Sequence, residues 1–235
     1  MSLPKLNNAP KYTITIPSTQ KQVRFRPFLV KEEKVLMLAA ESKDQTQMYN
    51  AVVDTIIACV EEPIERQSLT TFDIEYLFVK IRAKSVGETA EFGIKCSKCG
   101  ESNKVSINVD DINIKVPIIK DTIDLTDNIK LKMRWPKYLD IIKMQLEGSK
   151  LSAADQTFHT IAYCVDSILT EDDVIKVSDQ PMSEMVDFID QLNNTQFEML
   201  KNYIQQIPQL SHTLNFKCNC GQDNTVVLSG MKDFF

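Results

Sequence analysis

Two pairs of closely spaced cysteines, far apart in the chain, constrain its fold more than any other feature. Each pair is followed by a glycine and lies in a predicted turn between two short strands. This is the pattern of a zinc ribbon, in which two hairpins each supply two thiolates to one tetrahedral Zn²⁺. The sequence therefore predicts one structural zinc ion that draws two distant hairpins together. Its predicted ligands are Cys96, Cys99, Cys218 and Cys220.

Four thiolates would fill the coordination shell, which indicates a structural and not a catalytic metal. Two other interpretations stay open: turns that hold no metal, and a thioredoxin-like redox pair in the C-x-x-C motif, although no βαβ pattern surrounds that motif. His212 shares a strand face with Cys218 and is a weaker candidate ligand. Cys59 and Cys164 fall on apolar helix faces, so we expect both to be small core residues. An oligomer with exchanged hairpins would satisfy the same spacing.

The chain also has the pattern of two diverged copies of one unit, residues 1–110 and residues 111–235. Each copy is predicted to contain a β-hairpin, then helices, then a hairpin with one cysteine pair, so the fold class is α+β. The copies would be joined by the zinc-ribbon-like site. The first hairpin is predicted at Tyr12–Ile16 and Gln22–Arg26. The aligned segments are Thr55–Glu61 with Thr160–Asp166, Ile94–Cys96 with Phe216–Cys218, and Cys99–Val105 with Cys220–Val226.

Apolar side chains at helical spacing predict the helices in each copy. In the first copy, one helix begins near Thr70 and ends at Gly87, where glycine permits a left-handed end. In the second copy, helices are predicted at Ser152–Leu169, 182–192 and 196–207. The apolar side of the first helix in the chain is predicted to consist of Val30, Val35, Leu36, Leu38 and Ala39.

Charge and apolar patterning restrict the class of partner. Residues 1–110 carry 15 basic and 14 acidic side chains, whereas residues 111–235 carry 12 basic and 18 acidic ones. A surface with this negative balance is a poor match for the phosphates of duplex nucleic acid. No apolar run reaches the roughly 20 residues of a membrane-spanning helix, and the N-terminus lacks the apolar stretch of a secretory signal. We therefore expect synthesis in the cytosol, with reduced cysteines.

Motifs of the common enzyme classes are missing from the sequence. It contains no GxxxxGK[ST], no GxGxxG after a strand, no HExxH and no GxSxG. Its six glycines are too few for the phosphate-cradling loops of nucleotide-dependent enzymes. We therefore expect a protein without enzymatic activity.

Two segments carry a family resemblance. They are Val23–Lys34, with the sequence VRFRPFLVKEEK, and Phe72–Glu88, with the sequence FDIEYLFVKIRAKSVGE. Both resemble the baseplate hub subunit and hub-assembly proteins of T-even-type contractile-tailed phages, most clearly over the first 110 residues. The resemblance implies a non-enzymatic viral protein that acts in forming the central hub of the tail baseplate. It also implies other hub or tail proteins as partners, in the host cytoplasm during assembly or in the virion tail baseplate.

Those two segments and the C-terminus contain candidate partner-binding residues, because basic and aromatic side chains together are typical of protein interfaces. The alternative is that the aromatic side chains belong to the core and the charges are only solvated. A competing function is that of a zinc-ribbon accessory factor that binds nucleic acid, although such factors usually carry more basic residues around the ribbon. The candidate partner-binding residues are Arg24, Phe25, Arg26, Phe28, Tyr76, Phe234 and Phe235.

Overall fold

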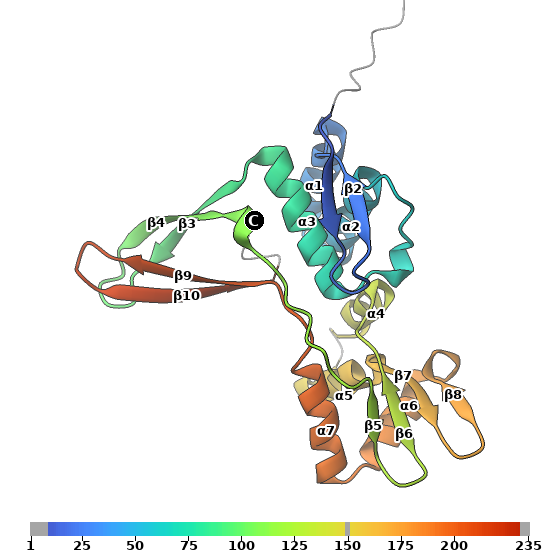
Figure 1. The fold of residues 1–235 in the computed structure, drawn as a ribbon. Helices are drawn as coiled ribbons and strands as arrows, with labels where there is room; N and C mark the ends of the chain where they lie inside the picture. Colours follow the sequence, from blue (N-terminus) through green and yellow to red (C-terminus); the bar gives the residue numbers. More distant parts are fainter. Residues whose placement is uncertain (1–8, 149–150, 231–235) are drawn as a thin grey trace, which may run out of the picture. The chain divides into compact units, whose positions relative to one another are not determined.

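The computed structural model describes residues 9–148 and 151–230, and these form an α+β protein, as the sequence predicts. The chain divides into two compact units, and it leaves the first unit and later returns to it (Figure 1). None of the helices in the described ranges is long and apolar enough to cross a membrane. The first unit comprises the chain up to Arg66, Phe72–Lys115 and the segment from Gln209 onward, and the second comprises Gln67–Thr71 and Val116–Pro208.

The first unit opens with an antiparallel hairpin followed by helices, in the predicted order. Ile14, Val23 and Phe25 are buried on one face of the hairpin, while Thr13 and Arg24 between them are exposed. This alternation has the period of two that the sequence shows. The bounds of these elements are β1 Tyr12–Thr15, β2 Gln22–Phe25, α1 Val30–Ser42, α2 Gln45–Cys59 and α3 Thr71–Val86.

A buried carboxylate in the first turn of helix α3, that of Asp73, connects the helix to the first hairpin. Asp73 accepts hydrogen bonds from the backbone N–H of Ser18 at 2.9 Å and from its hydroxyl at 2.5 Å. The helix ends before Gly87, whose φ of +145° is a conformation that side chains disfavour, so the predicted end is confirmed. The apolar residues of this helix follow the helical spacing and are buried: Phe72, Ile74, Leu77, Phe78 and Ile81.

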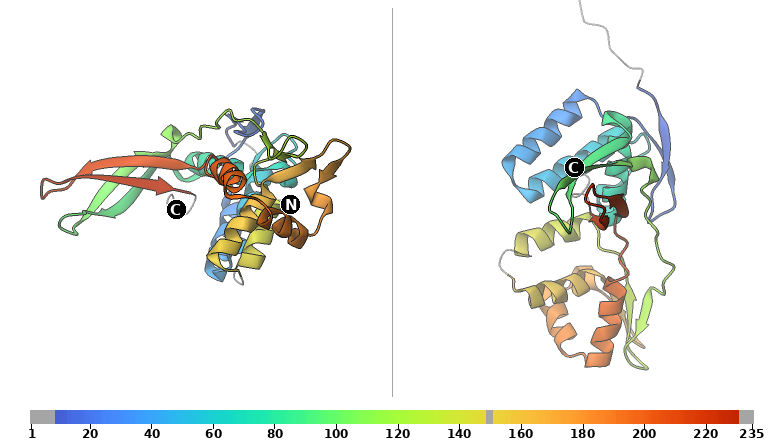
Figure 2. Two further views of the ribbon diagram at one scale, coloured as in Figure 1. Left: turned by 90° about the horizontal axis from the view of Figure 1, so that it is seen from below. Right: turned by 90° about the vertical axis from the view of Figure 1, so that its left-hand side faces the viewer.

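Two further hairpins complete the first unit, and each forms its own antiparallel two-stranded sheet. They share an apolar core with α3 and run side by side (Figure 2). Away from this core most of their residues are exposed or half-buried. The strands are β3 Thr89–Lys95, β4 Ser102–Asn108, β9 Ser211–Lys217 and β10 Asp223–Ser229. The buried residues of the shared core are Val79, Ala83, Ala90, Ile107, Val109, Ile112, Leu210, Leu214 and Leu228.

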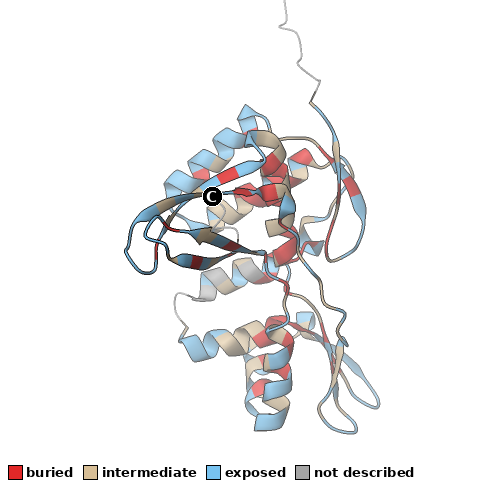
Figure 3. Ribbon diagram, turned by 60° about the vertical axis from the view of Figure 1, so that its left-hand side comes forward, coloured by how far each residue is buried: buried red, intermediate tan, exposed pale blue. Residues whose placement is uncertain are grey.

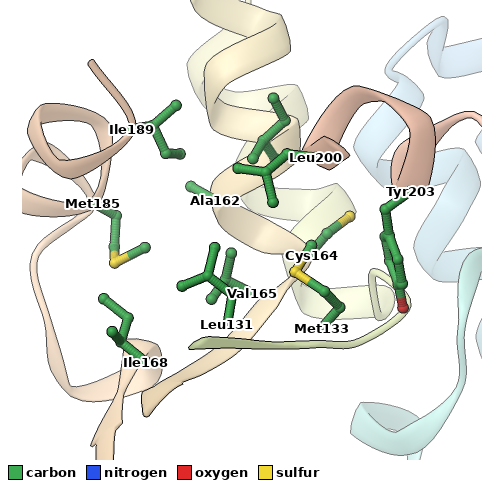
Figure 4. Packing of buried hydrophobic residues seen from close by; sticks show 11 residues of the cluster. Leu131, Met133, Ala162, Cys164, Val165, Ile168, Met185, Ile189, Leu200 and Tyr203 are labelled. Carbon is green, nitrogen blue, oxygen red and sulfur yellow. The ribbon is translucent and has the colours of Figure 1, made fainter. Parts of the chain in front are cut away.

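The second unit contains a four-stranded antiparallel sheet with the strand order β5-β6-β7-β8. Its core joins strands and helices, since Leu131 of β6 and Val165 of β7 pack with Ile189 of α6 and Leu200 of α7 (Figure 4). The elements are β5 Thr122–Asp124, β6 Lys130–Met133, α4 Tyr138–Gly148, α5 Ala153–Tyr163, β7 Val165–Leu169, β8 Val174–Lys176, α6 Met182–Asp190 and α7 Asn194–Ile204. Short 3₁₀ helices occur at Arg66–Ser68, Val109–Asp111 and Val177–Asp179.

The predicted helix Ser152–Leu169 is wrong in its second part. Helix α5 ends at Tyr163, and the following residues form strand β7, which pairs with β6 on one side and β8 on the other. Ile168, for example, lies opposite Leu131 of β6. The apolar residues of this segment satisfy a helical period as well as a buried strand, so their spacing alone does not distinguish the two. The neighbouring strands, which are distant in the sequence, decide the outcome.

Helix α1 also differs from the amphipathic helix that the sequence predicts. Ala39 alone of its five predicted apolar residues is buried, whereas Val30, Val35 and Leu38 are 79%, 47% and 56% exposed. Figure 3 shows how burial is distributed over the ribbon. The helix is instead held through the carboxylate of Glu32, which is 6% exposed. A polar contact therefore replaces the expected apolar one.

Arg26 and Arg134 stand at the centre of two arrangements of the same kind, one in each unit. Each arginine follows the second strand of a hairpin and binds a carboxylate six residues later. Arg26 donates to Glu32 at 2.9 Å, and Arg134 donates to the two carboxylate oxygens of Asp140 at 2.6 and 3.1 Å. Each carboxylate also accepts a hydrogen bond of 2.8 Å from the backbone N–H three residues before it. Both therefore close the first turn of the following helix.

The same two arginines hold the end of a helix against the hairpin. The backbone N–H of Arg26 donates to the carbonyl of Cys59 at 3.0 Å, and that of Arg134 donates to the carbonyl of Cys164 at 2.7 Å. In both units, the residue after the cysteine also pairs with the residue before the arginine. These contacts lie in the two helix segments that align in the sequence, so a local structure recurs together with the sequence.

The two compact units do not coincide with the predicted copies, residues 1–110 and 111–235. The hairpin β9–β10, which belongs to the second copy by sequence, lies in the first unit. The copies are defined by sequence similarity and the units by spatial contact, so the division into units does not test the duplication. The duplication stays a prediction.

Candidate metal centre

The turn between β3 and β4 is closed by backbone hydrogen bonds around the C-x-x-C motif. The N–H of Cys96 donates to the carbonyl of Glu101 at 2.9 Å, and the N–H of Gly100 donates to the carbonyl of Cys96 at 3.0 Å. Gly100 has a φ of +75°, which glycine adopts without a steric penalty. The glycine after the second cysteine thus has a geometric role in this turn.

The turn between β9 and β10 has the same construction, although the C-x-C motif is one residue shorter. The N–H of Cys218 donates to the carbonyl of Gln222 at 2.9 Å, and the N–H of Gly221 donates to the carbonyl of Cys218 at 2.9 Å. Gly221 has a φ of +84°. The two cysteine turns are therefore structural counterparts, in agreement with their sequence alignment.

The two turns bring four sulfur atoms together within the first unit. Sγ of Cys96 lies 3.8 Å from Sγ of Cys220, and Sγ of Cys99 lies 3.6 Å from Sγ of Cys218. All four sulfur atoms lie within 4.8 Å of one another. One cysteine of each turn is buried and the other is exposed. The four cysteines that the sequence predicts as ligands are thus arranged so that they could hold a metal ion.

Asn224 joins the two turns through a second set of contacts, which the sequence did not single out. Its side-chain oxygen accepts hydrogen bonds from the backbone N–H and the hydroxyl of Ser97 at 2.9 and 2.8 Å. Its Nδ2 group donates to Sγ of Cys96 at 3.6 Å, and the residue is 6% exposed. Asn224 also donates to the carbonyl of Gln222 in its own hairpin at 3.1 Å, and Asn103, its aligned counterpart, makes the equivalent bond to the carbonyl of Glu101 at 2.9 Å. The alignment of the two asparagines is the signal from which this contact could have been found.

The backbone around Cys96 favours its ionised form. The N–H groups of Cys99 and Lys98 point to its sulfur and lower the pKa of the thiol, against the opposing effect of burial. The thiolate is the form that binds metal ions. At Cys96 the backbone of the turn therefore favours the form that binds a metal ion. At Cys99 the backbone N–H of Glu101 also lowers the pKa, but the neighbouring thiol of Cys220 and burial outweigh it and raise the pKa.

The other candidate ligands lie elsewhere. His212 pairs with Leu228 across β9 and β10, and in the described part of the chain the cluster of potential metal ligands contains the four cysteines alone. Cys59 and Cys164 are buried at 1% and 0% exposure, which confirms them as core residues. Burial raises the pKa of their thiols, to about 11 for Cys59 and about 12 for Cys164, so both stay neutral at physiological pH.

The aromatic residues predicted to bind a partner lie in different surroundings. Phe25 is 3% exposed, and its ring centroid lies 5.6 Å from that of Tyr12. It is therefore a core residue of the first unit, which is the alternative that the sequence left open. Phe28 and Tyr76 are half-buried, so each keeps a surface that a partner could contact.

The predicted partner-binding arginines are already engaged within the first unit. Arg24 is at the surface and binds the carboxylate of Glu62 at 3.1 Å. Arg26 belongs to the helix-anchoring arrangement described above and is largely shielded. Phe234 and Phe235 lie outside the described residues.

Comparison with known proteins covers nearly the whole chain. A family model described as T4 bacteriophage base plate protein matches residues 9–235. The baseplate hub assembly protein gp26 of Enterobacteria phage T4 is 24% identical over 228 residues, which cover 96% of this chain and 98% of that protein. No solved structure is significantly similar.

Proposed function

This chain belongs to the family of T4 bacteriophage base plate proteins, and we propose that it acts, without enzymatic activity, in forming the central hub of the tail baseplate. The observation that carries this proposal is the coverage of the matches. The family model spans residues 9–235, and the hub assembly protein of phage T4 aligns with 96% of the chain. We propose other hub or tail proteins as its partners, the host cytoplasm as the place of assembly, and the tail baseplate as the structure that it helps to build.

Within that function, we propose that Cys96, Cys99, Cys218 and Cys220 hold one structural Zn²⁺. Zinc–thiolate bonds are about 2.3 Å long, so sulfur atoms at the corners of a regular tetrahedron around zinc are about 3.8 Å apart. The distances of 3.8 and 3.6 Å between the hairpins support this assignment. Four thiolates leave no coordination position for water, so the ion would contribute folding free energy and no catalysis.

We further propose that the chain consists of two diverged copies, residues 1–110 and residues 111–235. The recurring arrangement around Arg26 and Arg134 supports this, because a hairpin, a helix start and a helix end recur with the same contacts. The paired cysteine turns are a second recurring element. In this proposal, the zinc ion joins the last hairpin of one copy to the last hairpin of the other.

Deletion of the gene from a phage that encodes this chain tests the proposed function. We expect infected cells to accumulate baseplates without a complete hub, as seen by electron microscopy, and infectivity to return when a plasmid supplies the wild-type protein. Normal, infectious particles in its absence would overturn the proposal. Mass spectrometry of purified particles then distinguishes a permanent hub component from a factor that leaves after assembly.

A further inference from the structure

The first unit contains a cavity of about 540 Å³ between the first hairpin and α3, away from the cysteine cluster. All four residues of β1 line it, and α3 lies beside β1 (Figure 1). From α3 the cavity is lined by Tyr76, Lys80 and Lys84, which are spaced four residues apart and therefore form one stripe along the helix. Asp110 also lines the cavity.

Strand β1 offers backbone hydrogen-bonding groups at its outer edge. Its sheet has the order β1-β2, so in the described part of the chain no other strand pairs with β1. The bond from the N–H of Ile16 to the carbonyl of Lys21 sets the register, and alternate residues of an antiparallel pair face the partner strand. The backbone N–H and C=O groups of Ile14 therefore point to β2, while those of Thr13 and Thr15 point to the outer edge. A free edge of this kind can accept an additional strand.

The two lysines of the stripe have different surroundings. Lys84 forms ion pairs with Asp110 and Glu88, and its Nζ lies 5.4 Å from the ring centroid of Tyr12. Lys80 donates to the backbone carbonyl of Asp110, and its Nζ lies 5.5 Å from the ring centroid of Tyr76. Lys80 is half-buried, and this burial lowers its pKa. Asp110 and Asp111 act on Lys80 through their charges, but among the described residues no carboxylate lies within ion-pair distance of its Nζ, whereas Lys84 already has two. A carboxylate brought into the cavity would therefore form its strongest new ion pair with Lys80.

We propose that this cavity binds an extended segment of a partner protein, which pairs with the outer edge of β1 and places a carboxylate at Lys80. The dimensions agree, because Tyr76 and Lys84 are about 12 Å apart along the helix axis and a strand of four residues spans about 13 Å. The half-buried ring of Tyr76 adds apolar surface beside the segment. This inference rests on the proposed function, and it names the chemistry by which a hub or tail protein would be recognised.

Affinity selection with peptide pools tests this inference on the full chain. Two pools of acetylated, amidated hexapeptides are used, random except for a fixed glutamate in one and a fixed glutamine in the other. We expect the wild-type protein to retain the glutamate pool about tenfold more than the glutamine pool, since one charge-assisted hydrogen bond is worth about that factor. Equal retention of the two pools would overturn the proposal.

Three variants locate the binding. Lys80→Gln should abolish the preference for glutamate, whereas the exposed Lys34→Gln on α1 should keep it. Thr13→Pro should reduce retention of both pools, because proline removes an outward N–H and is tolerated on an edge strand. Circular dichroism and metal content must match the wild type in each case. If Lys80→Gln abolishes the preference for glutamate but Thr13→Pro leaves retention unchanged, the cavity binds only a carboxylate group. The proposed strand pairing with β1 is then overturned.

The peptide pools contain no phage protein, so this experiment and the gene deletion fail independently. If the protein retains both peptide pools equally, the proposal that the cavity binds a partner segment is overturned, and the proposed hub function is unaffected. Normal particles after the deletion overturn the hub function, whatever the groove binds.

Discussion

The two halves of the chain hold a helix end against a hairpin with the same contacts, yet they continue differently beyond it. Arg26 and Arg134 each bind a carboxylate six residues later and the carbonyl of a buried cysteine. After the bridge at Val60, the carboxylate of Glu62 accepts the backbone N–H of Arg24 at 2.6 Å, so this N–H is not available to continue the ladder. After Val165, the chain continues as β7, which pairs with β6 and β8. The shared contacts thus fix where the helix ends, and the residues that follow decide whether a strand forms.

The largest effect that we predict concerns the proposed zinc site, to which each half of the chain would contribute two cysteines. Cys96→Ser and Cys218→Ser each remove one of four thiolates, so we expect both variants to lose zinc and to melt at least about 10 °C lower, because the bound ion supplies several kcal/mol. Metal analysis and differential scanning calorimetry measure this. Asn219→Ser, in the middle of the C-x-C motif, keeps all four thiolates and serves as the control. A variant of either cysteine that keeps stoichiometric zinc and the wild-type melting temperature would contradict a shared site.

The second prediction tests whether the two arginine arrangements are equivalent. Arg134→Met leaves Asp140 largely shielded without its cation, and we expect a loss of about 3 kcal/mol in the free energy of unfolding. Arg26→Met should cost somewhat less, because Lys31 stays 3.3 Å from the carboxylate of Glu32, although the side chains of the two pairs are comparably exposed, 22% and 7% against 25% and 11%. Urea unfolding measures both losses. The double variant Arg134→Met with Asp140→Leu should recover most of the stability, because no charge is then left unpaired. A negligible cost for one arginine and a large cost for the other would show that the arrangements differ in function.

The third prediction sharpens the difference between the two cysteine turns. Asn224 and Asn103 each donate to a carbonyl of their own hairpin, but Asn224 also contacts Ser97 and the sulfur of Cys96 in the opposite hairpin. We expect Asn224→Ala to weaken zinc binding about tenfold, as is typical for the loss of a group that orients a ligand. Competition with a chelator measures the affinity, and Asn103→Ala should leave it unchanged. Equal effects of the two substitutions would mean that the hairpins are held by the metal alone.

The smallest predicted effect is a pH dependence in the first arrangement. Burial of Glu32 opposes its ionisation, but hydrogen bonds from Arg26 and from the N–H of Leu29 outweigh burial and lower the pKa of the carboxyl group. A carboxyl group with a lowered pKa stabilises the fold fully above its unfolded pKa of about 4.3, and this contribution is lost as the pH falls through the lower, folded value. The difference in unfolding free energy between the wild type and Glu32→Gln should therefore be constant near pH 6 and shrink below about pH 4. A difference that grows on acidification would contradict this sign.

Local patterns allowed the sequence to predict a large part of the fold and most of the site. The two cysteine pairs specify their own turns through short spacing and a following glycine, so the four cysteines that come together could be named without a structure. The first hairpin and α3 were predictable for the same reason, since a period of two and a period of 3.6 are visible within each segment. The burial of Cys59 and Cys164 also follows from helical spacing alone.

Features that depend on distant partners could not be predicted in this way. Strand β7 forms because β6 and β8 lie on either side of it. The exposure of Val30, Val35 and Leu38 on α1 likewise depends on what packs against that helix, which the spacing of its apolar residues does not show. The cavity between β1 and α3 is lined by both Tyr12 and Lys84, which lie close together only in the folded state. The four-residue spacing of Tyr76, Lys80 and Lys84 was visible in the sequence, but nothing local indicates what this stripe faces.

Native mass spectrometry of the purified protein, before and after denaturation, is the most direct test of the central claim that one metal ion joins two hairpins of one chain. We expect one zinc ion per monomer, lost on denaturation and absent from both Cys96→Ser and Cys218→Ser. Two zinc ions per dimer would indicate hairpins exchanged between chains. Wild-type protein without metal, or zinc retained in either variant, would contradict the claim.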